Sequence, residues 1–221
     1  NPNAFMQSYN LAFDGGNDKG HYAFSSSYFS QDGTIIGSDY ERLTLRLNSD
    51  YKIREWLKFG EHLSVVSSRG RNAMNNSSSP GASVISAALA MAPWDPTHYP
   101  EGSVTQSGKD LSGQIAASSN FKNVTNPFSM VEHSHPQNNT ERLVGDIFLE
   151  INPIKDLTLR SSLSMDYSIV RDRTFKEQYE YSSYDKSDKN FLSSAITRYS
   201  TLLEETTLTY AKEIGKHNFS I

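Results

Sequence analysis

Apolar and polar residues alternate with a period of two through most of the chain, and this alternation predicts β-strands rather than helices. It is most regular in residues 40–48, where Leu43, Leu45 and Leu47 share one face and polar side chains occupy the other. Several of the predicted strands reach the ~9–11 residues that a tilted strand needs to cross a bilayer. Eight strands are predicted in all, over residues 8–14, 21–29, 40–48, 57–68, 142–151, 157–170, 195–211 and 217–221.

The connections between these strands alternate between short and long along the chain. Short connections are expected at 15–20, 49–56, 152–156 and 212–216, and long ones at 30–39, 69–141 and 171–194. Tight turns at one rim and long loops at the other are typical of outer-membrane β-barrels. We therefore predict an all-β fold, an antiparallel up-and-down meander that forms a section of a large transmembrane β-barrel. Residues 1–221 are the partial barrel, 69–141 form a long extracellular loop, and the alanine-rich segment 82–92 is one short helix in that loop.

The composition narrows the possible functions. The formal net charge is −4, which disfavours a nucleic-acid-binding surface because such a surface needs a clustered basic excess. The chain has no cysteine, so disulfides and thiolate metal sites are excluded. Aromatic residues make up 11% of the chain, and many lie near the ends of predicted strands, where their rings would suit a membrane interface. We expect no metal and no cofactor.

Several short motifs resemble one family. The segment Tyr-Asn-Leu-Ala-Phe-Asp-Gly-Gly-Asn-Asp-Lys at 9–19 is similar to the hairpin that opens the barrel of SusC/RagA-type TonB-linked outer-membrane proteins. Further segments continue in the order of that family, at 31–36, 38–42, 45–48, 56–60, 126–128, 157–161, 208–210 and 215–217. The resemblance covers nearly the whole chain and is thinnest over 69–122.

The resemblance implies a TonB-dependent transporter in the outer membrane of Bacteroidota, in contact with outer-membrane lipid, that imports oligosaccharides or peptides. It implies a SusD-like surface lipoprotein as partner, and TonB as a partner reached through an N-terminal part missing from this sequence. An alternative from the residues alone is a soluble extracellular β-sandwich that binds glycans. A third is a structural or adhesion β-protein without a ligand.

Polar faces of the predicted strands would line the barrel lumen. We expect the Asp146 carboxylate and the Arg160 guanidinium to lie within reach of each other across the turn at 152–156. One interpretation of this face is contact with a plug or with passing substrate, and the other is a solvated wall of mutually paired charges. The residues expected to face the lumen are Arg42, Arg46, Lys58, His62, Asp146, Arg160 and Asp166.

The long loop carries the best candidates for a contact with substrate or with the lid lipoprotein, at Trp94, Asp95, His98 and Tyr99. The other interpretation of these residues is packing within the loop. His133 and His135 invite a metal site, but Glu132 is the one carboxylate near them in the sequence, so we disfavour it. No catalytic motif is present, and we predict that the chain is not an enzyme.

Glu204 shares its predicted face with Leu202 and Leu208. A carboxylate among lipid-facing residues is unfavourable near the middle of a bilayer. We therefore expect Glu204 on an extension above the lipid.

Overall fold

A computed structural model describes residues 3–72, 83–117, 124–181, 186–215 and 217–221. These residues form one eight-stranded antiparallel sheet in the order β1-β2-β3-β4-β5-β6-β9-β10, plus a two-stranded hairpin, β7-β8. The strands of the sheet are β1 (Met6–Asn17), β2 (Gly20–Asp32), β3 (Asp39–Arg54), β4 (Leu57–Arg71), β5 (Ser134–Ile154), β6 (Leu157–Lys176), β9 (Phe191–Ile214) and β10 (His217–Ser220). The hairpin strands are β7 (Tyr179–Glu180) and β8 (Lys186–Ser187), and the helices are α1 (Val84–Ala90) and α2 (Pro127–Glu132).

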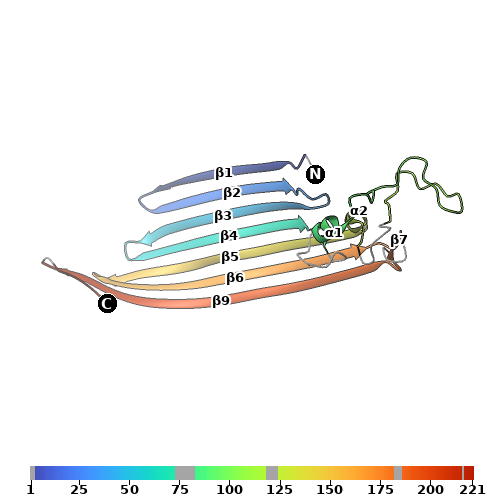
Figure 1. Cartoon of the computed structure of the whole chain (residues 1–221). Helices are drawn as coiled ribbons and strands as arrows, with labels where there is room; N and C mark the ends of the chain where they lie inside the picture. The colour runs from blue at the N-terminus through green and yellow to red at the C-terminus, as the bar shows by residue number, and fades with distance from the viewer. Residues whose placement is uncertain (1–2, 73–82, 118–123, 182–185, 216) are drawn as a thin grey trace.

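Short turns and long loops lie at opposite ends of the sheet, as the connection lengths predicted (Figure 1). Two-residue turns at 18–19, 55–56 and 155–156 join β1 to β2, β3 to β4 and β5 to β6. The turn at 18–19 is closed by the amide N–H of Lys19, which donates to Asn17 Oδ1 at 2.8 Å. Asp156 takes the left-handed backbone conformation, with φ of 69°, that a tight turn of this kind requires. The predicted up-and-down meander is confirmed.

The strands extend further than the alternation predicted, and this changes the boundaries of the loops. β4 continues to Arg71 and β5 begins at Ser134, so the long connection runs over 72–133 rather than 69–141. Within it, 73–82 and 118–123 lie outside the described residues, as does Lys216 in the last turn. The predicted helix is present as α1, and a second helix, α2, was not predicted.

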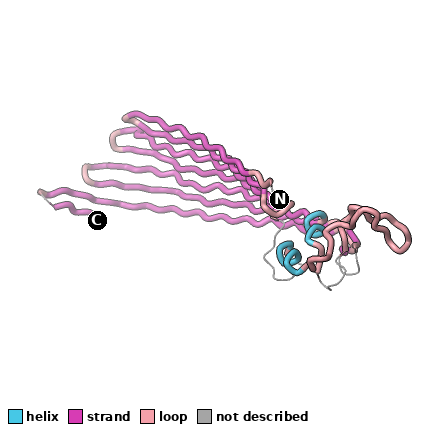
Figure 2. The backbone as a smooth tube through the Cα atoms, turned by 45° about the horizontal axis from the view of Figure 1, so that its top comes forward, coloured by secondary structure: helices cyan, strands magenta, loops and turns pink. Residues whose placement is uncertain are grey.

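The sheet is a single layer, and both helices lie beyond its loop end (Figure 2). A β-sandwich would need a second sheet packed against the apolar face. In the described part of the chain, the other sheet is only the two-stranded hairpin, with two residues in each strand. The sandwich alternative is therefore not supported by the fold.

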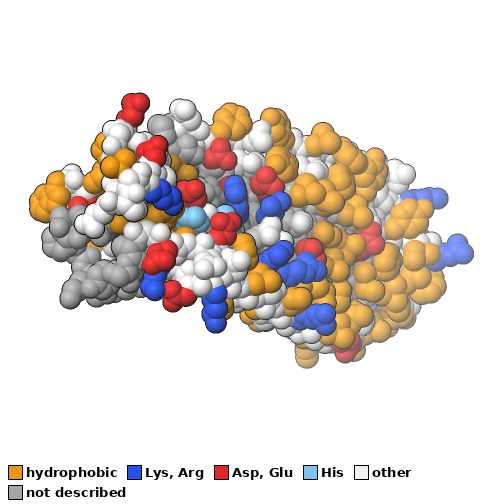
Figure 3. All heavy atoms as spheres, turned by 90° about the vertical axis from the view of Figure 1, so that its right-hand side faces the viewer, with side chains coloured by type: hydrophobic (Ala, Val, Ile, Leu, Met, Phe, Trp, Pro, Cys, Tyr) orange, Lys and Arg blue, Asp and Glu red, His pale blue; other side chains and the backbone are white. Residues whose placement is uncertain are grey.

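Residues paired across neighbouring strands share a face, so the register divides the sheet into an apolar face and a polar face. Figure 3 shows apolar side chains gathered over a broad surface of the sheet. The apolar face carries Tyr9, Leu11, Phe13, Tyr22, Phe24, Tyr28, Leu43, Leu45, Leu47, Leu57, Phe59, Leu63, Val65, Leu143, Ile147, Leu149, Ile151, Leu157, Leu159, Leu163, Met165, Tyr167, Ile169, Leu202, Leu208 and Tyr210. We call this set the apolar band.

The dimensions of the apolar band match those of a membrane. On β6 the band runs from Leu157 to Ile169, which is about 40 Å along a strand at ~3.3 Å per residue. At the ~40° tilt of barrel strands, that length covers about 30 Å along the barrel axis. The hydrocarbon core of a bilayer has about this thickness. Among the described residues, no helix is both long and apolar enough to cross a membrane.

The register also shows that the strands are staggered. Gly20 lies opposite Tyr51, yet β3 runs on to Arg54 before its turn. Similarly, Leu157 lies opposite Tyr210, and β9 runs on to Ile214. Each short turn is displaced from the previous one in the same direction, as in a sheet whose strands tilt across a barrel wall.

Glu204 does not lie on an extension, contrary to expectation. It is opposite Leu163 in the middle of β6 and close to Leu202 along β9, so it belongs to the level of the apolar band. Its Oε1 accepts a hydrogen bond from the Thr206 hydroxyl at 2.7 Å, and this hydroxyl lies 3.0 Å from Ser161 Oγ. Because the strands are staggered, the part of β9 that lies at the level of the apolar band includes Glu204.

Aromatic rings cover glycines of neighbouring strands. On the polar face the ring of Phe148 lies over Gly60, where a Cβ atom would collide with the ring edge, and only 5% of Phe148 is exposed. On the apolar face the Tyr22 ring covers Gly15, and the Tyr51 ring covers Gly20. Such pairs fill the space that a missing side chain leaves and so fix the strand register.

We expect Gly60→Ala to destabilise the sheet by about 1–3 kcal/mol, because the new methyl group must displace the buried Phe148 ring. Gly70→Ala on the same strand is the control, since its Cβ would meet Tyr40 at an ordinary 3.4 Å. The temperature at which the folded, fast-migrating gel band of the membrane-extracted protein disappears would fall for the Gly60 variant only. Equal midpoints for both variants would contradict this packing.

Candidate functional site

The polar face of the sheet carries a ladder of ion pairs. Lys58 Nζ lies 3.1 Å from Asp50 Oδ2, and His62 Nδ1 lies 3.1 Å from Asp146 Oδ1. Arg142 binds Asp166 with two nitrogen atoms, at 2.9 and 2.5 Å. The groups are partly exposed to solvent, where each such pair stabilises a protein by at most about 1 kcal/mol. The main effect of these ion pairs is therefore to neutralise charges on a solvent-exposed face.

The seven residues expected to face the lumen all lie on this polar face, by the register of β3, β4, β5 and β6. The expected contact between Asp146 and Arg160 is wrong. Asp146 lies opposite Ser164 and pairs with His62, whereas Arg160 lies opposite Glu150, with 3.8 Å between Nη1 and Oε2. The prediction placed the turn across 152–156, whereas β5 continues to Ile154 and the turn is only 155–156, so Asp146 lies opposite Ser164 and beyond reach of Arg160.

Phe148 is the one large apolar side chain that the described part of the sheet buries, and charged groups enclose it. The Arg160 guanidinium lies 3.9 Å from the centre of its ring, a cation–π contact. The His62 imidazole stacks against the same ring, with 5.7 Å between the ring centres. Phe148 thereby fixes the positions of the Arg160 and His62 side chains, two of the residues expected to face the lumen.

A hollow of about 450 Å³ lies beside this cluster, lined among others by Arg46, His62, Asp146 and Asp166. Arg46 lies opposite Ser25 and Ser64, and Arg42 lies opposite Phe29 and Ser68. In the described part of the chain, neither arginine forms an ion pair with a carboxylate. Arg42 and Arg46 are thus two cations on this face that are available to an anionic group from outside the sheet.

The long loop between β4 and β5 has a core of its own. Apart from Phe148, every buried apolar residue of the described chain lies in this loop, for example Val84, Ala87 and Ile115. Asn126 is fully buried at its centre. Its Nδ2 donates to the carbonyl oxygens of Thr97, at 2.9 Å, and Ala116, at 2.7 Å.

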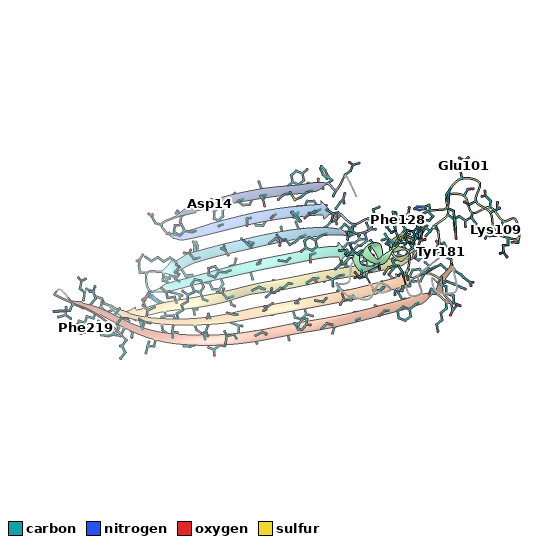
Figure 4. All side chains as sticks on the ribbon, viewed as in Figure 1. Asp14, Glu101, Lys109, Phe128, Tyr181 and Phe219 are labelled. Carbon is teal, nitrogen blue, oxygen red and sulfur yellow. The ribbon has the colours of Figure 1, made fainter. Side chains whose placement is uncertain are left out.

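The same Asn126 side chain begins α2. Its Oδ1 accepts the amide N–H of Phe128 at 3.0 Å, as an N-cap residue does, and Pro127 follows at the first helical position. One side chain therefore joins three segments of the loop. Figure 4 shows Phe128 close to the end of the sheet, while Glu101 and Lys109 lie at the far tip of the loop.

The four candidate residues of the loop do not form one surface. Trp94 is 68% exposed, whereas Asp95 is only 9% exposed. The Tyr99 hydroxyl accepts the amide N–H of Ala117 at 3.2 Å, and the His98 ring packs edge-on against Phe128. Trp94 alone of the four presents a large exposed ring, and the other three take part in contacts within the loop. Whether any of them binds substrate or a lid stays a prediction.

A second cluster joins the loop between β4 and β5 to the loop after β6, and only His133 and His135 of its members were singled out from the sequence. Glu177, just after β6, accepts from His135 Nε2 at 3.1 Å and lies 3.4 Å from His133 Nδ1. The His133 ring stacks on Tyr179, with 4.5 Å between the ring centres, and its Nε2 lies 2.8 Å from the Tyr181 hydroxyl. We call these five residues the loop latch.

The loop latch concentrates hydrogen bonds on one carboxylate. The bonds from His135 and His133 hold the pKa of the Glu177 carboxyl below its ordinary value. The described residues include no group of three or more His, Asp or Glu side chains arranged to bind a metal ion. Alternation along a strand could reveal His133 and His135, but Glu177 is 42 residues from His135 and needs the paired β5 and β6 to reach it.

Comparisons with known proteins place this geometry in context. The chain is 26% identical over 230 residues to TonB-dependent receptor P3 of Formosa agariphila, a match that covers 96% of this chain and 20% of that protein. No model of a protein family matches the chain. The chain therefore spans about a fifth of the length of the curated relative it matches.

Solved structures show the same fold. The RagAB peptide importer in its closed-closed state matches 98% of this chain and 23% of its own, with a TM-score of 0.70 and 21% identity. The open-open state gives the same values, and another structure of the RagAB peptide transporter gives a TM-score of 0.67 at 20% identity. The eight-stranded meander is a section of a barrel wall of this kind. The predicted resemblance to SusC/RagA-type TonB-dependent transporters is confirmed.

We expect the loop latch to open in acid. Because the pKa of Glu177 is lowered, its bonds stabilise the latch above the ordinary glutamate pKa of about 4.3 and are lost as the pH falls through the lowered value. Hydrogen exchange of the α2 amides, corrected for intrinsic rates, should therefore be slow near neutral pH and fast in strong acid. Glu177→Gln should exchange fast at both.

Glu132→Gln is the control, since Glu132 ends α2 and takes no part in the latch. It should keep the exchange profile of the unaltered protein. Slow exchange in Glu177→Gln near neutral pH would show that the latch does not hold the loops together.

Proposed function

We propose that this chain forms part of the wall and outer loops of an outer-membrane, TonB-dependent transporter that imports peptides or oligosaccharides. The observation that carries the proposal is a single staggered sheet with one apolar and one charged face, tight turns at one end and folded loops at the other. A sheet with these properties is stable where one face meets lipid and the other meets water.

In this proposal the polar face lines the lumen. Its ion-pair ladder keeps the wall hydrated, and Arg42 and Arg46 are the positions at which a plug carboxylate or an anionic solute would be held. Energy would come through TonB, by way of a part of the transporter outside these residues. No bond is made or broken in such transport, in keeping with relatives that are named as receptors and importers.

The folded loops are the proposed docking surface for a SusD-like surface lipoprotein. Among the described residues of the loop, the large apolar side chains left exposed are Leu89, 83% exposed, Trp94, Val104 and, more modestly, Ile85. Exposed aromatic and aliphatic anchors of this kind commonly dominate the affinity of protein interfaces. The RagAB structures are of peptide importers, which supports peptides as one of the two substrate classes.

Cell fractionation and uptake test the transporter proposal. An antibody raised against residues 72–133 should detect a polypeptide several times larger than 24.8 kDa in the outer membrane, because the chain spans only part of its relatives. Deleting its gene should abolish growth on, and uptake of, one peptide or oligosaccharide fraction, and uptake should need TonB. A soluble protein, or full uptake without TonB, would contradict the proposal.

We expect the double substitution Leu89→Ser with Trp94→Ala to reduce copurification of the lipoprotein about thirtyfold, since a Trp anchor that is buried on binding often contributes about 2 kcal/mol. Trp56→Ala is the control, because Trp56 is also half exposed but lies in a short turn at the opposite end of the sheet. Quantitative affinity purification from membranes measures both. Unchanged copurification in the double variant would place the lid contact elsewhere.

A further inference from the structure

Arginines gather on the apolar side of the sheet, at and just beyond the last residues of the apolar band at the loop end. Arg171 and Arg173 follow Ile169 on the same face of β6. Arg69 of β4 lies opposite Asn139 of β5, which in turn lies opposite Arg171, and Arg198 of β9 lies opposite Ile169. We call Arg69, Arg171, Arg173 and Arg198 the arginine cluster. Figure 3 shows Lys and Arg side chains, interspersed with Asp and Glu side chains, along the boundary between the loop end and the apolar surface.

The arginine cluster is only partly balanced by nearby acids, because Glu41 lies directly opposite Arg69 and Glu141 is a second nearby carboxylate, against four arginines. Arg171 pairs with Glu141 at 2.8 Å, and this is the one ion pair to a carboxylate that the described residues provide for the cluster. The Gln137 amide oxygen, in the orientation that satisfies both groups, accepts two N–H groups of Arg69 at 3.0 and 3.2 Å. That contact orients the Arg69 guanidinium without neutralising it, and the described residues include no ion pair between Arg69 and a carboxylate.

A neighbouring arginine shows why the cluster is distinctive. Arg71 also lies at this rim, but it is paired with Asp39, and Asp32 and Glu41 act on it as well. Asp32, Asp39 and Glu41 thus lie on β2 and β3, whereas the four arginines lie on β4, β6 and β9 with Glu141 of β5 among them. Positive charge is concentrated where the wall leaves the apolar band, on the side away from the lumen.

The chemistry of the cluster fits phosphate. A guanidinium offers parallel N–H donors that bind two phosphate oxygens at once, and it keeps its charge at any physiological pH. Residues two positions apart on one strand face and diagonal neighbours on the next strand are about 7–8 Å apart, so several long side chains can meet around one anion. Acyl chains of a lipid would lie against the apolar band directly below.

We propose that the arginine cluster binds the phosphate groups of a phosphorylated lipid in the leaflet at the loop end of the barrel. This inference rests on the proposed function, because it requires the apolar band to lie in the outer membrane. The bound lipid would use both features of the surface, its phosphates meeting the arginines and its chains meeting the band.

Lipid binding by the intact transporter, purified from the outer membrane and stripped of lipid, tests the proposal. The probes are lipid A with its phosphates and the same lipid after enzymatic dephosphorylation, counted on the protein by native mass spectrometry. The phosphorylated probe should be retained about tenfold better, since each surface cation near an anionic headgroup contributes a substantial share of binding. Equal retention of the two probes would overturn the proposal.

Matched variants locate the effect. Replacing all four arginines of the cluster by glutamine should abolish the preference for phosphate, while Arg42→Gln with Arg46→Gln on the opposite face should leave it unchanged. Glu141→Gln removes the cluster's carboxylate and should increase retention of the phosphorylated probe. A preference that survives the fourfold change, or that is lost in the polar-face control, would contradict the assignment.

Two further results separate the alternatives. Inorganic phosphate at the concentration of the lipid should not displace the lipid, and displacement would identify a site for free anions instead. A transporter absent from the outer-membrane fraction would refute the proposed function itself, before any lipid is added. One that is present there but indifferent to lipid phosphate would refute only this inference.

Discussion

Every part of this structure depends on the pairing of backbone hydrogen bonds between neighbouring strands. A strand in lipid has no water for its N–H and C=O groups, so each must be satisfied by the next strand. Antiparallel pairing does this from β1 through β6 to β9, and the pleat then sends alternate side chains to opposite faces. The alternation of side chains thereby produces an apolar band and a charged face from the same strands.

The burial pattern follows from this single layer. A sheet with nothing packed on it leaves most side chains in contact with its surroundings, and Phe148 is buried because Arg160 and His62 close over it beside Gly60. The loop between β4 and β5 is stabilised differently. It lies outside the sheet and needs its own apolar core, which Asn126 organises through hydrogen bonds to Thr97, Ala116 and Phe128.

The elements that local pattern controls could be predicted from the sequence. The alternation around Leu43, Leu45 and Leu47 identified a strand, and the lengths of the connections identified the order of turns and loops. Contacts that depend on register could not be predicted. Asp146 binds His62 rather than Arg160 because the turn is at 155–156 rather than across 152–156, and the stagger of the strands places Glu204 opposite Leu163.

The misses in the loops have related causes. α2 has only six residues, too few for a periodic pattern, although Asn126 followed by Pro127 is a recognisable helix start. Glu177 comes together with His133 and His135 only after β5 and β6 have paired. Exposure separated the loop candidates in a way that residue type could not, since Trp94 and Asp95 are adjacent in sequence and differ most in burial.

The most direct test of the account is thiol labelling along one strand of the intact protein in its membrane. The chain has no cysteine, so single cysteines introduced along β6 report only their own positions in this section. A charged, water-soluble reagent should label positions 162, 164 and 166 on the polar face and spare 161, 163 and 165 on the apolar face. Labelling without this period of two would contradict a wall with one face in lipid and one in water.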